Sequence, residues 1–376
     1  MFTQIPSLLR GIEHKAWQIA ESEAFQFPED FTIDPSRNLL VCLYRHASRH
    51  DTVFEVKPLS VESGKPHPDA SNPSLRVTCE DVVSPTWSYD IRTFDRFIGA
   101  LCTPDEVAYS ELMLWNWETG ELIKRVEGPM SFAFLSERYI MYTVERMEDN
   151  ATIPILALLN LDQGSRSQPF LELQVVKDFI GLLDVSIHTE CPPATQQRCK
   201  APFGTNFQDR LFVVCIRMFN YRDEEAYHFA LFLRLSELLR LAEDAEEILV
   251  SWESWGPKRS KLLEIDFSDV WVCFVYGLKA VVMNPRPNPS AIFPKEFRLL
   301  DFNDSPIRRG GDVDDNVEVS LETVTGATQF RTPVTTSLPC RIIKGSVPES
   351  SSAIMLSEDA LLTVSDDESE MTLYSF

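Results

Sequence analysis

Short apolar runs recur along the whole sequence and are separated by polar loops. They are rich in β-branched and aromatic residues and too short to be buried helices, which is typical of strands in a sheet core. After a polar loop, each is followed by a second strand-like run. The first runs span residues 39–44, 97–102, 139–144, 211–216, 270–275 and 360–364. This repeat predicts an all-β chain.

The spacing of the runs favours a β-propeller over other all-β folds. A WD-like blade contains four strands in about 40–50 residues, and stacked blades bury sheet faces that no single sheet can bury alone. Residues 26–376 are predicted to form this domain, with six or seven blades and seven favoured. Its last strand, residues 371–376, is expected to close the ring by pairing with a strand from the N-terminal third. The alternative, a pair of β-sandwiches, would need stricter alternation of apolar and polar residues.

Two segments have helical periodicity instead. Residues 1–25 are predicted to form a short N-terminal helical linker, because Leu8, Leu9, Ile12 and Ala16 recur at intervals typical of one helix face. A second helix is expected over residues 236–249, with an acidic, solvated face.

Charge and cysteine usage limit the possible partners and compartments. The 376-residue chain has 35 Lys and Arg against 57 Asp and Glu, a formal net charge of −22. Such a surface disfavours nucleic acid and anionic membranes, and it favours a basic or polar protein partner. The scattered cysteines, among them Cys42, Cys215 and Cys273, are expected to be buried, reduced thiols of an intracellular protein, cytoplasmic or nuclear. No apolar run is long enough to span a bilayer.

The sequence contains no motif that predicts catalysis. Cys and His residues do not cluster at the spacings of a structural zinc site. The Gly-x-Ser-x-Gly nucleophile turn and the glycine-rich phosphate-binding motifs are absent. We therefore predict no catalytic, cofactor-binding or metal-binding residues, and a protein that is not an enzyme. Because carboxylates are abundant, a glycosidase-like hydrolase on a propeller scaffold stays as an alternative, as does a non-catalytic structural remnant.

Aromatic residues beside turns are the predicted protein-contact sites, because a buried aromatic anchor often dominates an interface. Trp252, Trp255 and Tyr221 fit this description. Trp115 and Trp117 alternate along one strand and are expected to pack between blades. Replacing Trp255 by Ala is therefore expected to weaken partner capture without unfolding the protein, whereas Trp117→Ala should lower the unfolding midpoint.

The segment Leu112-Met-Leu-Trp-Asn-Trp-Glu-Thr-Gly120 resembles the strand and turn that close a WD-type blade, with Trp117-Glu118 in the place of Trp-Asp. The order of short segments along nearly the whole chain resembles the C-terminal region of the expanded F-box proteins of mushroom-forming fungi. The matching segments are residues 33–41, 114–120, 132–139, 255–257, 272–277, 299–302 and 354–359.

This resemblance implies a β-propeller-like region that presents a target protein to a ubiquitin ligase. Members of the family also carry an F-box, a helical segment that docks on a Skp-type adaptor. No F-box is recognisable before Leu8. Adaptor docking is therefore expected only if an F-box is restored upstream, whereas the prediction of a protein target does not depend on it.

Overall fold

The computed structural model divides the chain into two compact units. Unit 1 contains residues 1–138, 161–163 and 191–204, and unit 2 contains residues 139–160, 164–190 and 205–376. The residues that the structure describes are 2–4, 11–19, 27–48, 50–80, 84, 86–105, 110–148, 151–162, 169–177, 179–190, 209–244, 248–265, 274–283, 295–303, 316–326, 328–347, 351–357, 360–365 and 370–375.

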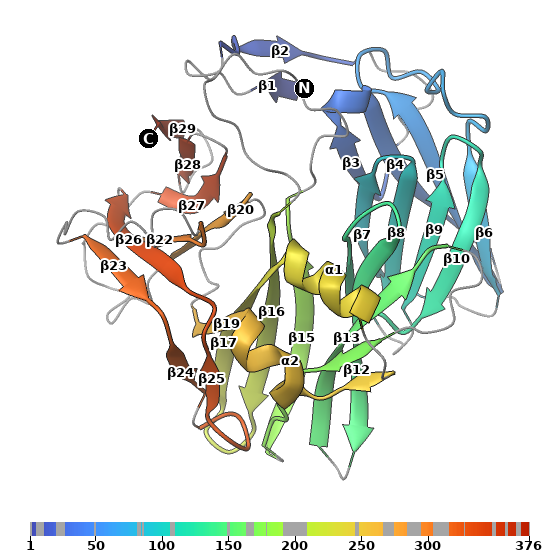
Figure 1. Ribbon diagram of the computed structural model, residues 1–376. Coiled ribbons are helices and arrows are strands. Elements are labelled where there is room, and N and C mark those ends of the chain that lie inside the picture. The colour runs from blue at the N-terminus through green and yellow to red at the C-terminus, as the bar shows by residue number, and fades with distance from the viewer. Residues whose placement is uncertain are drawn as a thin grey trace. The chain divides into compact units, whose positions relative to one another are not determined.

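The described residues form mainly antiparallel sheets, which confirms the prediction of an all-β chain. Unit 1 contains two four-stranded sheets, each a meander of strands that follow one another in the sequence (Figure 1). The first contains β3 (Asp30–Asp34), β4 (Leu39–Ala47), β5 (Asp51–Ser60) and β6 (Leu75–Glu80). The second contains β7 (Trp87–Phe94), β8 (Phe97–Pro104), β9 (Glu111–Asn116) and β10 (Glu121–Glu127). A 3-10 turn, η2 (Pro35–Arg37), joins β3 to β4, and β11 (Ser131–Phe134) ends the unit's strands.

The core of unit 1 lies between the two meanders. Alternate residues of β4 and β8, such as Leu39, Val41 and Ile98, share one apolar cluster with Trp115 and Trp117. On β8, the absence of a side chain at Gly99 is required by packing, because a Cβ atom there would lie 2.5 Å from the ring of Phe132. The expectation that Trp115 and Trp117 pack between sheets is confirmed within this unit.

Unit 2 is built from further sheets, all antiparallel except for the parallel pair of β14 and β18. One sheet contains β12 (Tyr139–Glu148), β13 (Ala151–Asn160), β14 (Phe170–Glu172) and β18 (Leu249–Val250), and the next contains β15 (Ile180–His188), β16 (Leu211–Asn220), β17 (Glu225–Arg234) and β19 (Ser260–Glu264). A third sheet contains β20 (Val275–Tyr276), β21 (Lys279–Met283), β22 (Lys295–Asp301), β26 (Cys340–Val347) and β23 (Val317–Ser320). The fourth contains β27 (Ser351–Leu356), β28 (Ala360–Ser365) and β29 (Met371–Ser375). A separate hairpin pairs β24 (Thr323–Thr325) with β25 (Val334–Thr336). One apolar cluster joins the last three sheets.

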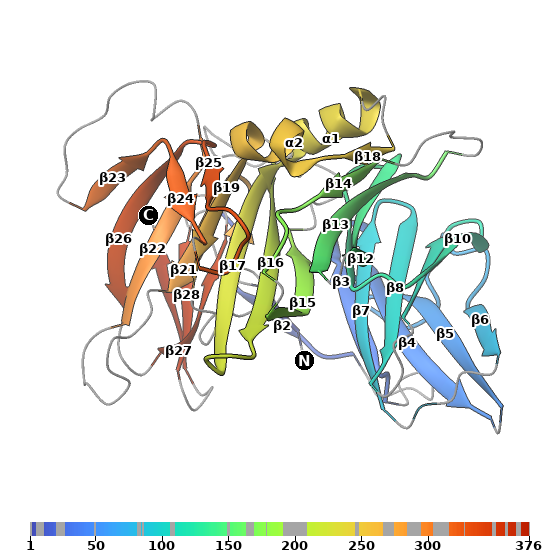
Figure 2. The same cartoon turned by 90° about the horizontal axis from the view of Figure 1, so that it is seen from below.

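Two α-helices occur among the described residues, and both lie along one end of the sheets of unit 2 (Figure 2). Helix α1 (Leu235–Asp244) confirms the first part of the helix predicted over residues 236–249, whereas Leu249 belongs to strand β18. The helix buries Leu235, Leu238 and Leu241. Helix α2 (Trp252–Arg259) was not expected, since its sequence resembled a turn.

The predicted N-terminal helix was wrong for the described residues. Instead, β1 (Phe2–Gln4) pairs antiparallel with β2 (Lys15–Trp17). Gly11 has a φ of +66°, a left-handed conformation that interrupts any continuous right-handed helix. Trp17 then packs against the sheet of β4, and its indole Nε1 donates a hydrogen bond to the Val61 carbonyl oxygen at 3.4 Å. Long-range packing of Trp17 therefore outweighs the local helical pattern.

The expected closing pair was also wrong for the described strands. The sheet of β29 contains only β27 and β28 besides β29 itself, with no strand from the N-terminal third. Met371 and Tyr374 are accordingly exposed on an edge strand. Cys42 and Cys215 are buried and free, as predicted, whereas Cys273 lies outside the described residues.

Candidate functional site

Trp252 and Trp255 do not form a contact surface, and this prediction was wrong. Both side chains are buried, with Trp255 only 1% exposed. Their rings meet edge to face at a centroid distance of 5.2 Å, and the Trp255 indole Nε1 donates to the Glu172 carbonyl oxygen at 2.9 Å. Because the segment forms helix α2, the two indoles three residues apart lie on the same helix face, which packs inward.

Tyr221 is exposed, as the sequence suggested. It follows β16 at the tip of the β16–β17 hairpin, and 67% of its surface is accessible. Its ring meets Phe219 edge to face at 5.4 Å, and a Cβ atom on Gly181 would lie 2.7 Å from the ring. The phenol ring therefore rests on the bare backbone of strand β15. This support fixes the exposed ring before any partner arrives, which lowers the entropy lost on binding.

The turn after Tyr221 is acidic and held by local contacts. Asp223, Glu224 and Glu225 are all exposed, and Asn220 Nδ2 donates to the Asp223 carboxylate at 2.7 Å. Arg222 points back over the ring of Phe179, with 4.0 Å between its guanidinium carbon and the ring centroid. An exposed aromatic ring beside three carboxylates is a chemical arrangement that favours a cationic side chain of a partner. The aromatic and acidic tip, residues 221–225, is here called the Tyr221 tip.

A carboxylate also perturbs Tyr227, which lies just beyond the Tyr221 tip. Its hydroxyl donates to Glu225 Oε2 at 2.8 Å, and this hydrogen bond to an anion raises the pKa of Tyr227.

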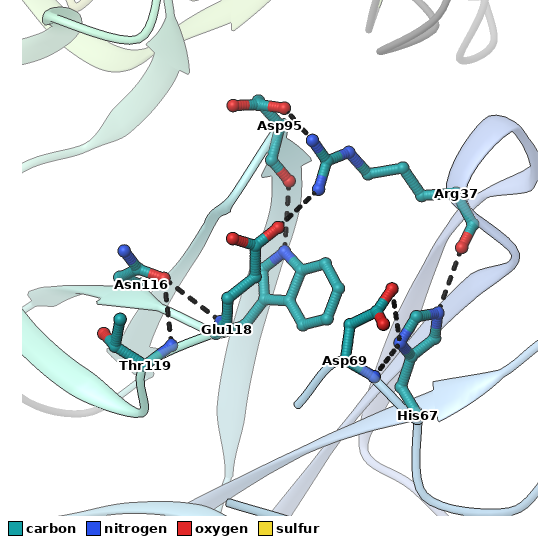
Figure 3. A network of polar contacts seen from close by, with 8 residues as sticks. Arg37, His67, Asp69, Asp95, Asn116, Glu118 and Thr119 are labelled. Carbon is teal, nitrogen blue, oxygen red and sulfur yellow. Dashed lines mark hydrogen bonds and ion pairs between the residues drawn. The ribbon is translucent and has the colours of Figure 1, made fainter. Parts of the chain in front are cut away.

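Trp117 contacts a polar network of unit 1, of which Figure 3 shows Arg37, His67, Asp95 and Glu118. Its indole Nε1 donates to the Asp95 carbonyl oxygen at 3.0 Å, and the imidazole of His67 meets its ring edge to face at 4.9 Å. The Arg37 guanidinium pairs with the Asp95 carboxylate and, at 2.8 Å, with the Glu118 carboxylate. The two sheets of unit 1 are thus tied together at the turn that resembles a WD blade end.

His67 extends the network. Its Nδ1 accepts from the Asp69 backbone N–H at 3.2 Å, so Nε2 carries the proton that is donated to the Arg37 carbonyl oxygen at 3.0 Å. The sequence predicted the turn at Trp117 but missed Arg37, His67 and Asp95. No motif links these residues, because they come from three separate turns. The contacts hold the fold and leave little of His67 exposed.

The described residues offer little for metal or nucleophilic chemistry. No group of three or more His, Cys, Asp or Glu side chains among them is arranged to hold a metal ion. Burial raises the pKa of the Cys42 thiol to about 11, and burial together with the hydrogen bond to Glu111 raises that of Cys79 to about 12. Both thiols therefore stay protonated, whereas nucleophilic cysteines need a thiolate.

A comparison with protein-family models finds no match to this chain, and neither does a comparison with curated proteins. None of the described helices has the length and apolar character needed to cross a membrane.

Proposed function

We propose that this chain is a protein-binding β-propeller that captures its target through the Tyr221 tip. The observation that carries the proposal is an exposed tyrosine ring held against Gly181 and Phe219 beside three exposed carboxylates. Interface hot spots are enriched in tyrosine, and truncating one costs about 2 kcal/mol or more. The formal net charge of −22 supports a basic target, since opposite charge steers association.

The propeller architecture is supported by the order of the sheets along the chain. The described residues contain six successive, mainly antiparallel sheets of three or more strands, two in unit 1 and four with strands in unit 2. We propose that each is one blade, which favours six blades over seven. The two sheets of unit 1 share one apolar cluster and the last three sheets of unit 2 share another, as blades do when they stack.

The substrate receptor of an F-box-type ubiquitin ligase is the most specific form of the proposal. Its support is the resemblance of the ordered segments to the expanded fungal F-box proteins. In this role the propeller holds the target, and a Skp-type adaptor would bind only through an F-box segment. A direct test is whether a purified Skp-type adaptor binds the chain with and without an F-box fused before Met1.

The Tyr221 tip is tested by quantitative affinity purification with wild-type, Tyr221→Ala and Tyr374→Ala proteins. Tyr374 is a matched control, because it is an exposed tyrosine of unit 2 on edge strand β29. The wild type and the control should recover the same partners in equal amounts. With Tyr221→Ala the recovered amount should fall at least tenfold, since about 1.4 kcal/mol of binding free energy corresponds to a factor of ten. Equal recovery with all three proteins would place target binding elsewhere.

A further inference from the structure

Among the residues that the structure describes, strand β23 ends its sheet and pairs on one side only. The sheet order is β20-β21-β22-β26-β23, and Val319 lies opposite Arg341 of β26. The Lys344 N–H donates to the Asn316 carbonyl oxygen at 2.9 Å, so the backbone groups of residues 316, 318 and 320 face β26. Those of Val317 and Val319 therefore face away from the sheet, and Leu321 follows directly after the strand.

The outward-facing positions also carry exposed apolar side chains. Val319 is 50% exposed and Leu321 is 62% exposed. Proteins usually protect a sheet edge with lysine, proline, a bulge or a covering segment. Residues 316–322 contain neither lysine nor proline, and β23 pairs with β26 without a bulge. The edge thus offers apolar surface and backbone groups that pair with no other described strand.

The inner side of β23 is firmly held. Lys261 of β19 is fully buried, and its Nζ donates to the Ser320 hydroxyl oxygen at 2.7 Å. Lys344 of β26 also pairs with Glu318 of β23, with 3.3 Å between its Nζ and the carboxylate. These contacts fix the position of the strand, so an added strand would meet an edge that is already ordered.

We propose that β23 binds an extended segment of a partner protein by strand addition, and that this segment alternates apolar residues with Lys or Arg. The proposal rests on the protein-binding function proposed above and adds a second surface to it. Apolar side chains of the segment would pack beside Val319 and Leu321, and a cation would meet the exposed Glu322 carboxylate. A second copy of this chain is disfavoured as the occupant, because each copy carries a net charge of −22.

A fluorescent peptide of sequence Lys-Val-Lys-Val-Lys-Val-Lys is the probe. We expect saturable binding, and slower amide hydrogen exchange at Val317, Val319 and Leu321 than in the free protein. Two further peptides carry N-methyl groups either on every valine or on every internal lysine. Only alternate residues of an added strand face β23, so one of these two peptides should lose binding and the other should retain it.

Two variants test the edge from the protein side. Val319→Pro removes an outward N–H while leaving the hydrogen bonds to β26, and should raise the Kd of the peptide at least tenfold. Glu322→Lys should weaken the same peptide and favour its Glu-Val counterpart. Glu370→Lys, an equal charge change beside the edge strand β29, is the matched control and should leave Kd unchanged. Thermal unfolding checks that each variant is folded.

Four results would overturn the proposal. Equal binding by wild type and folded Val319→Pro would exclude the β23 edge, as would equal loss or equal retention by the two N-methylated peptides. A dimer that Val319→Pro abolishes would identify a second copy as the occupant. Peptide binding lost with Tyr221→Ala but not with Val319→Pro would place the contact at the Tyr221 tip, so that the proposed function stands and the strand addition fails.

Discussion

At the scale of single residues, Glu55 is a buried carboxylate that several neighbouring side chains keep ionised. Its side chain is 4% exposed on β5, where it accepts hydrogen bonds from Ser74 Oγ at 2.5 Å, Arg76 Nη2 at 2.8 Å and, at the same distance, His46 Nε2. Burial alone raises the pKa of Glu55, but these hydrogen bonds and the nearby Lys57 outweigh it and lower the pKa to about 2.

Glu55→Gln should therefore destabilise the protein at neutral pH and lose its effect in acid. The folded-state pKa lies below the ordinary value of 4.5, so the unfolded state takes up the proton first. The stabilisation by the carboxylate is complete above pH 4.5 and disappears as the pH falls towards about 2. Urea unfolding of wild type and variant between pH 7 and 3 measures the difference. A difference that stays constant over this range would contradict the ionised, paired carboxylate.

Buried tryptophans give a second prediction at this scale. Trp117 and Trp255 are each at most 1% exposed, and each indole N–H donates to a backbone carbonyl. Replacing either by Ala should cost about 3–5 kcal/mol of the free energy of unfolding. Chemical denaturation of both variants tests this. If the denaturation midpoint were nearly unchanged in Trp255→Ala but lowered in Trp117→Ala, Trp255 would be a surface residue and its burial would be contradicted.

At the scale of elements, the Tyr221 tip depends on the strand beside it. Gly181 of β15 lies opposite Phe219 of β16, and its missing side chain leaves the space that the Tyr221 ring occupies. Gly181→Ala should displace the ring, because the added carbon would lie 2.7 Å from it. The ring is at the end of a hairpin, so its movement should cost little stability.

NMR of protein labelled at tyrosine measures this displacement. The Tyr221 ring signals should shift in Gly181→Ala, whereas those of Tyr374 on β29 should not. Partners that depend on Tyr221 should also be recovered less efficiently. Unchanged Tyr221 signals would show that the ring is not held by the neighbouring strand.

For the whole molecule, the excess of carboxylates affects both folding and binding. A formal net charge of −22 destabilises compact states by self-repulsion, and salt screens this repulsion. Raising the salt concentration from 10 to 150 mM should therefore raise the thermal unfolding midpoint while it weakens binding of the Lys-Val peptide. Over this range of salt concentration the Debye length falls from about 30 to 8 Å, so interactions between distant surface charges are largely screened. A lower midpoint at higher salt would indicate that stabilising ion pairs outweigh the repulsion.

The sequence by itself determined which segments become strands where apolar runs are local and continuous. Residues 39–44, 97–102, 139–144, 211–216 and 360–364 lie within β4, β8, β12, β16 and β28, and the first part of the helix predicted over residues 236–249 corresponds to α1. The side-chain pattern is sufficient there, because the local periodicity of apolar residues indicates whether a segment is a strand or a helix.

Only the tertiary structure decided which side chains are exposed and which strands lie at an edge. Trp255 and Tyr221 both stand beside turns in the sequence, yet one packs on Glu172 and the other remains in solvent on Gly181. The partners of Arg37 lie 58 and 81 residues away, at Asp95 and Glu118. The free edge of β23 likewise depends on its pairing with β26. Such contacts join residues distant in the chain, and no local pattern encodes them.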